Sequence, residues 1–111
     1  MDQIAHKYSG SVAGTVINID STGPVHLRAL TCLNTTAAVA YLQLFNIAAS
    51  SVTIGTTAPT LSIGIPASAS LVFPLPENGL LMGGSGLSAA GTTTRAGATG
   101  ASQDVNILWG N

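Results

Sequence analysis

Charge is the property that this 111-residue chain has least of. Three Lys or Arg residues and four Asp or Glu residues make up 6% of it, against about 25% in a typical soluble domain. The formal net charge is −1, and no basic stretch with interleaved aromatic residues occurs. Because neutralisation of phosphates by Lys and Arg dominates nucleic-acid binding, this composition argues against a nucleic-acid partner.

Cysteine pairs, long apolar runs and a leader-like beginning are also missing. Cys32 stands alone, which excludes an intrachain disulfide and a zinc site built from several thiolates. No run approaches the roughly 18 apolar residues of a membrane-spanning helix, so no membrane partner is expected. The first residues, MDQIAHKYSGS, lack a basic segment followed by an apolar one. No signal peptide is therefore predicted, and we expect synthesis in a cytoplasm.

Groupings of side chains that support catalysis or metal binding are rare. His26 and Cys32 are the one pair worth testing as base and nucleophile. They lie six residues apart on a predicted strand, about 20 Å at some 3.3 Å per residue, and cannot touch. The spacing of His6, His26, Asp20 and Asp104 matches no metal-ligand motif. We expect no enzymatic activity, no metal and no cofactor, and we interpret Cys32 as a small buried apolar residue.

Small residues are abundant instead. Ala, Gly, Ser and Thr fill almost half of the chain, so hydroxyls and backbone amides must provide most of the surface polarity. A surface with so few charges gives little repulsion between molecules. Two explanations remain open: a stable β-protein with a Ser/Thr surface, or a protein that is covered in an oligomer or on a larger body. We favour the second.

Apolar and polar residues alternate with a period of two along most of the chain, which is typical of β-strands. Strands are predicted at residues 14–20, 25–34, 38–46, 60–66, 70–76 and 104–110, with one or two more in 79–94 and a long loop at 47–59. No segment shows helical periodicity over eleven residues. About seven or eight short strands at this spacing predict an all-β fold, an antiparallel two-sheet β-sandwich of jelly-roll type.

The alternating faces of these strands predict a hydrophobic core. Its candidate residues are Val16, Leu27, Leu33, Tyr41, Leu61, Ile63, Leu71, Phe73, Val105 and Ile107. Burial of one such aliphatic side chain contributes about 1.5–3 kcal/mol. In residues 25–34, the alternation places Leu27 and Leu33 on the same inward face. A slip of one residue would reverse the faces of a strand.

The chain is predicted to be one domain with a short extension. Residues 14–111 are assigned to the β-sandwich. Residues 1–13 are interpreted either as an arm that reaches a neighbour or as a first edge strand, and both alternatives stay open.

Four segments together resemble a known group of proteins. They are NTTAAVAYLQLFN (34–46), GTTAPTLSIGIPASASLVFPL (55–75), GLSAAGTTT (86–94) and DVNILW (104–109). The positions that match are Asn34, Tyr41, Phe45, Asn46, Gly55, Pro59, Pro66, Gly86, Leu87, Thr92 and Asp104. Over residues 20–111 the chain resembles small β-sandwich virion structural proteins of tailed bacteriophages, although its Ala/Ser-rich 47–54 loop is longer than theirs.

This resemblance implies a structural role. The expected function is that of a capsid cement or decoration protein, a homotrimer on the capsid surface of the virion that is made in the host cytoplasm and binds the major capsid protein. A head-fibre, neck or tail appendage module is the first alternative. A carbohydrate-binding β-sandwich module is the second, and it would need an exposed aromatic platform, such as Tyr8 beside Trp109.

Residues that would contact partners are proposed from the arm, from the Gly-rich segment and from the chain end. The candidate interface residues are Ile4, His6, Tyr8, Leu81, Met82, Arg95 and Trp109.

Overall fold

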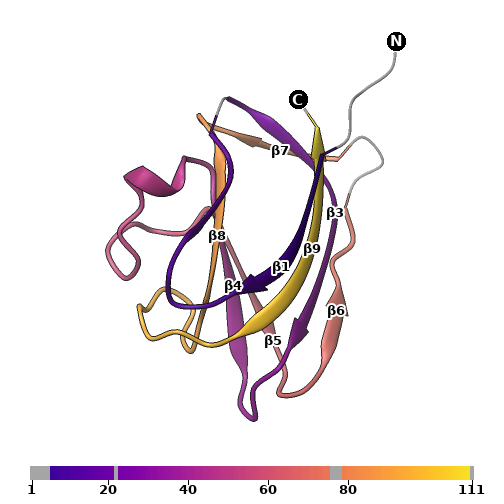
Figure 1. Ribbon diagram of the computed structural model, residues 1–111, viewed down its shortest axis with the longest axis vertical. Helices are drawn as coiled ribbons and strands as arrows, with labels where there is room; N and C mark the ends of the chain where they lie inside the picture. Colours follow the sequence, from indigo (N-terminus) through magenta and orange to yellow (C-terminus); the bar gives the residue numbers. More distant parts are fainter. Residues whose placement is uncertain (1–5, 22, 76–78, 111) are drawn as a thin grey trace.

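A computed structural model describes residues 6–21, 23–75 and 79–110 of the chain, and Figure 1 shows its course. Within these residues the chain forms nine strands and one short 3-10 helix. The elements are β1 (His6–Val12), β2 (Ile17–Asp20), β3 (Val25–Asn34), β4 (Ala40–Phe45), η1 (Ala49–Ser51), β5 (Leu61–Ile65), β6 (Ser70–Val72), β7 (Leu80–Gly83), β8 (Leu87–Thr92) and β9 (Gln103–Gly110).

The strands make two sheets that pack against each other. One has the order β1-β9-β3-β6, with β7 also paired to β3, and the other has the order β2-β8-β4-β5. All of these pairings are antiparallel. The predicted all-β, two-sheet sandwich is therefore confirmed. The segment 79–94 holds two strands, which gives the expected eight, and the ninth is the edge strand β1 at residues 6–12.

The boundary between β7 and β8 has a local cause. Gly84 takes a φ of +65°, a left-handed conformation that favours glycine. A Cβ at this position would collide with the carbonyl oxygen of Asn46, and that same oxygen accepts a hydrogen bond from the Ser85 amide at 3.1 Å. The break expected at the Gly83-Gly84 pair thus marks a tight turn that is packed under the end of β4.

A β-bulge in β3 corrects one prediction about the core. The register between β3 and β9 shifts between Leu27 and Ala29, so β3 carries one extra residue there. An extra residue reverses the faces of everything that follows it. Leu27 points inward, but beyond the bulge Leu30 and Cys32 are the buried residues, and Leu33 is 41% exposed. The prediction of Leu33 as a core residue is wrong for this reason.

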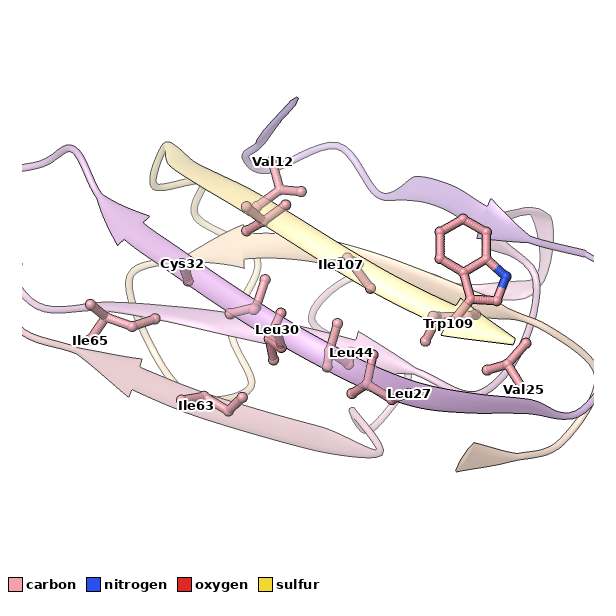
Figure 2. Close-up of a cluster of buried hydrophobic side chains, with 14 residues drawn as sticks. Val12, Val25, Leu27, Leu30, Cys32, Leu44, Ile63, Ile65, Ile107 and Trp109 are labelled. Atoms are coloured by element: carbon pink, nitrogen blue, oxygen red, sulfur yellow. The ribbon is translucent and has the colours of Figure 1, made fainter. Parts of the chain in front are cut away.

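The core lies between the sheets, where side chains from β3 and β9 meet those from β4 and β5 (Figure 2). Of the predicted core residues, Leu27, Ile63, Val105 and Ile107 belong to the buried cluster, and Leu61, Leu71 and Phe73 pack against it. Val16 and Tyr41 are half-buried outside that cluster. Cys32, interpreted from the sequence as a small buried residue, also belongs to the cluster, and the core residues that the prediction missed are Val12, Val25, Leu30, Leu42, Leu44, Ile65, Leu87, Ala89 and Trp109.

Two buried amide side chains connect the sheets at one end of the sandwich. The Nδ2 of Asn34, at the end of β3, donates to the carbonyl oxygens of Ile65 at 3.0 Å and Ala38 at 2.8 Å. The Nε2 of Gln103, at the start of β9, donates to the carbonyl oxygen of Tyr41 at 2.9 Å. Each amide hydrogen-bonds to backbone carbonyls of the opposite sheet, and each thereby joins one sheet to the other.

Candidate interaction surfaces

Cys32, the candidate nucleophile of the sequence, lies in the core. Cys32 donates its thiol hydrogen to the Oε1 of Gln103 at 3.0 Å and is buried. Burial, with a second contribution from the negative charge of Asp104, raises the pKa of Cys32 to about 12. The thiol therefore stays protonated at neutral pH, and a protonated thiol is a poor nucleophile. The interpretation of Cys32 as a small buried residue is confirmed.

In the part of the chain that the structure describes, no three His, Cys, Asp or Glu side chains come together to hold a metal ion. Over the same residues, no helix has the length and apolarity to cross a membrane.

His6 and Trp109 are neighbours across the β1–β9 pair, and their rings stack with centroids 5.5 Å apart and an interplanar angle of 30°. Trp109 is 7% exposed and belongs to the core. The Trp109 side chain faces the other sheet, because inward and outward residues alternate along β9, and its contact with a partner stays a prediction. His6 is exposed.

Tyr8 and Arg95 both lie against their own chain. The ring of Tyr8 packs against the core, and its hydroxyl donates to the carbonyl oxygen of Ser11 at 3.1 Å. The guanidinium of Arg95 lies 5.5 Å from the ring centroid of Tyr41 and donates to the carbonyl oxygen of Ser62 at 3.3 Å. Arg95 is exposed, and its contact with a partner stays a prediction.

The remaining predicted interface residues lie either in β7 or outside the described part of the chain. Leu81 and Met82 belong to β7, whose backbone pairs with β3. Ile4 lies outside the described residues.

The outer face of the four-stranded sheet is covered by loop 46–60. Ser88 of β8 donates its hydroxyl hydrogen to the carbonyl oxygen of Ile47 at 2.9 Å. Asn18 of β2 accepts a hydrogen bond from the amide of Ala49 at 2.9 Å. Figure 1 shows this loop, with η1, standing beside β8. The loop is thus held by polar side chains that point out from the sheet.

A second loop, residues 93–100, covers the rest of that face. Gln43 of β4 is fully buried, and its Nε2 donates to the hydroxyl of Thr92 at 2.7 Å and to the carbonyl oxygen of Gly97 at 3.2 Å. The hydroxyl of Ser62 donates to the carbonyl oxygen of Arg95 at 2.8 Å. Every residue of β8 is buried as a result. We call this covered surface the closed face.

The outer face of the five-stranded sheet is different, because its strands alternate between buried and exposed residues. In β9, Val105 and Ile107 are buried, whereas Asp104 and Asn106 are exposed. We call this surface the open face. Its outward residues are Lys7, Ser9 and Ser11 of β1, Asp104, Asn106 and Leu108 of β9, Ala29, Thr31 and Leu33 of β3, and Ser70 and Val72 of β6.

Short polar side chains on the open face are hydrogen-bonded to each other across the strands. The hydroxyl of Ser9 donates to the Oδ1 of Asn106 at 2.6 Å, and the Nδ2 of Asn106 contacts the hydroxyl of Thr31 at 3.3 Å. In the next row, the hydroxyl of Ser11 donates to Asp104 at 3.0 Å. These bonds hold the short side chains in place, so the surface is ordered before a partner binds. Among the outward residues of the open face only Lys7 and Asp104 are charged, so most of its area is uncharged.

Apolar side chains add to the open face near β6. Val72 is 73% exposed and Leu33 is 41% exposed. Val72 is opposite Thr31 in the pairing of β6 with β3, and Leu33 is two residues further along β3, so the two lie diagonally on one face. Sequence reasoning missed this surface. The alternation of Ser and Thr with apolar residues could have indicated it, but the bulge in β3 hid which residues face outward.

Comparison with known proteins gives one similarity. No protein-family model matches the sequence, and no curated protein matches it. Among solved structures, the chain is similar to one from the cyanophage Pam1 capsid asymmetric unit, with 17% sequence identity and a TM-score of 0.36, over 97% of this chain and 85% of that chain. A similarity at this TM-score does not establish a shared fold or function.

Proposed function

We propose that this chain is a structural protein of a bacteriophage virion, and that it binds the outside of the capsid as a cement or decoration protein. The open face carries this proposal. It is a broad sheet surface of ordered hydroxyl and amide groups with exposed Leu33 and Val72 at one side. It also fits the sequence resemblance to small virion proteins.

The physical chemistry of the open face suits attachment to a repeating lattice. Side chains that are already fixed by cross-strand hydrogen bonds lose little conformational entropy on binding. Few charges mean little desolvation of ionic groups when the surface is covered. Each contact is weak by itself, but many copies on one shell add their contacts as avidity. The partner on the shell is the major capsid protein, and the proposed role needs no catalytic group.

The alternatives are distinguished by location and by aromatic exposure. A head-fibre, neck or tail appendage module would use the same open face at another place on the particle. A carbohydrate-binding module would need an aromatic platform, and Trp109 is buried while Tyr8 packs on the core, so these two residues do not form one. The homotrimer that the resemblance implies stays a prediction.

The test begins with particles of the phage that encodes this chain. Mass spectrometry of gradient-purified particles is expected to find the chain at a high, fixed ratio to the major capsid protein, and immunogold labelling is expected to mark the head. Label confined to the neck or tail would favour the appendage alternative. Absence of the chain from purified particles would overturn the proposal.

A matched pair of variants then tests the surface. Particles that lack the protein are incubated with purified Val72→Glu, which places a charge on the open face, or with Ser50→Glu, which places one in η1 beside the closed face. We expect Val72→Glu to weaken binding by about tenfold or more, because a buried charge without a partner is costly, and Ser50→Glu to bind like the original protein. Equal binding of the two variants would contradict attachment through the open face.

A further inference from the structure

The edges of the two sheets are not equally protected against pairing with another strand. Exposed edges are usually blunted by shortness, proline, charge or a bulge. In the described residues, β6 has three residues with Pro74 close behind it, and β5 has five and is followed by Pro66. The edge strand β2 has four residues and a register shift between Asn18 and Asp20.

Edge strand β1 has few of these features that prevent pairing with another strand. It runs for seven residues, pairs with β9 in an unbroken register over all of them, and contains no proline. Its one charged residue is Lys7. No other described strand pairs with its second side. The unpaired side of β1 therefore presents a regular row of backbone donors and acceptors, which is a template for a further strand.

We propose that two copies of this chain pair through the free edges of β1, antiparallel to each other, about a two-fold axis at Ser9. This contact is independent of the proposed attachment to a capsid. It joins the two five-stranded sheets into one continuous sheet and brings the open faces of both copies onto one side. A two-fold contact is satisfied by two copies, so the species expected here is a dimer, in place of the homotrimer that the sequence resemblance implies.

The register follows from the sequence of β1. Residues that stand directly opposite in an antiparallel pair point to the same face, so only outward residues can oppose outward residues. An axis at Ser9 pairs all seven residues, with Lys7 opposite Ser11, Tyr8 opposite Gly10 and His6 opposite Val12. An axis at Tyr8 or at Gly10 would pair fewer residues of the strand. An axis at Lys7 would place two lysines face to face.

The charges of the open face are complementary in this register. Within the described residues, neither Lys7 nor Asp104 has an ion-pair partner, and Lys7 is opposite Leu108 in its own sheet, four residues from Asp104. In the dimer, Lys7 of one copy lies opposite Ser11 of the other, whose hydroxyl donates to Asp104. Two strand spacings of about 4.8 Å separate the backbones of Lys7 and that Asp104, a gap that their side chains can bridge. The two-fold axis produces this pair twice.

The pairing of Tyr8 with Gly10 also fits. A tyrosine covers a cross-strand glycine elsewhere in this chain, since Tyr41 of β4 is opposite Gly64 of β5 and a Cβ on Gly64 would lie 3.1 Å from the Tyr41 ring. The Tyr8 ring already lies over Gly10 of its own strand, where a Cβ would be 3.0 Å from the Tyr8 hydroxyl oxygen. Gly10 of the second copy offers no side chain that would obstruct this ring.

The first experiment measures mass in solution. Sedimentation equilibrium of the purified full chain, at concentrations from 1 to about 100 µM, is expected to show a monomer–dimer equilibrium. Ser9→Lys places two like charges at the two-fold axis and is expected to leave only monomer. Ser70→Lys, a matched change on β6 of the same open face, is expected to dimerise like the original chain. Circular dichroism checks that both variants keep the fold.

A charge exchange tests the register. Lys7→Glu alone and Asp104→Lys alone are each expected to raise the dimer dissociation constant by about tenfold, because each variant removes two attractive pairs. The double variant K7E/D104K restores the pairs and is expected to return close to the original value. A monomeric original chain, a trimeric mass, a dimer that survives Ser9→Lys, or a double variant no better than the single ones would overturn the proposal.

Discussion

The closed face and the open face are the outer surfaces of the two sheets, and both carry short polar side chains, yet one is covered and the other is exposed. On the closed face, outward side chains such as Gln43 and Ser88 are buried because they bind the backbone of two loops. On the open face, outward side chains such as Ser9 and Asn106 bind each other and stay exposed. Short polar residues serve both surfaces, and the difference lies in whether a loop returns over them.

This difference indicates where partners can bind. On the closed face, loops 46–60 and 93–100 are hydrogen-bonded to the outward side chains, so a partner there would meet loops. The open face exposes an ordered sheet surface that ends at the unblunted edge of β1. The proposed capsid contact and the proposed dimer contact thus use one side of the molecule.

The largest expected effect compares the two sides of β3 itself. Leu30→Ala removes a side chain that is 2% exposed, whereas Leu33→Ala removes one that is 41% exposed. We expect Leu30→Ala to lower the free energy of unfolding by about 3 kcal/mol and Leu33→Ala by less than about 0.5 kcal/mol. Urea denaturation measures both. The reverse order would mean that β3 has no bulge and that the faces are assigned incorrectly.

The next comparison sets a polar side chain of the closed face against one of the open face. Gln43→Ala leaves the part-buried Gly97 carbonyl and the buried Thr92 hydroxyl without this donor, and we expect a loss of about 2 kcal/mol. Asn106→Ala removes exposed hydrogen bonds and should cost less than about 0.5 kcal/mol. Thermal unfolding of both variants is the measurement. Equal losses would show that loop 93–100 does not depend on Gln43.

A smaller effect on stability comes from the thiol of Cys32, which faces the core from β3. The pKa of Cys32 is raised from 9.0 to about 12, so the folded state holds its proton at a pH where the unfolded chain releases it. This contribution is complete below pH 9 and is lost as the pH rises toward 12. Between pH 8 and pH 10 we expect stability to fall by about 1.4 kcal/mol, one pKa unit. Cys32→Ala, measured by urea denaturation at both pH values, should lack this component; an identical pH dependence would contradict it.

The smallest expected effect on stability compares two of the basic residues, Arg95 and Lys7. Arg95 lies over Tyr41 beside the closed face, and Lys7 has no ion-pair partner among the described residues of its own chain. In the monomer, Arg95→Ala is expected to cost about 0.5 kcal/mol and Lys7→Ala close to nothing. Denaturation at low protein concentration separates these effects from dimerisation. A larger loss for Lys7→Ala would indicate an interaction within the chain.

Several elements were accessible from the sequence because they depend on neighbouring residues. The bounds of β3 match the predicted strand 25–34, and the Gly83-Gly84 break separates β7 from β8 as expected. The wrong assignments depend on distant partners. Leu33 was misplaced by a bulge that only the register with β9 reveals, and the burial of Trp109 in the core was missed because it depends on the opposite sheet.

The amino-acid sequence by itself determined that this protein is built from short antiparallel strands with almost no ionic surface. Alternation with a period of two, turn residues and composition are local properties, and they suffice for that conclusion. Only the tertiary structure decided which sheet surface stays bare, where the two loops dock and which edge is left unpaired. Those outcomes depend on contacts between residues far apart in the chain. In β3, for example, the one extra residue of the β-bulge decides which of the side chains that follow it face the core.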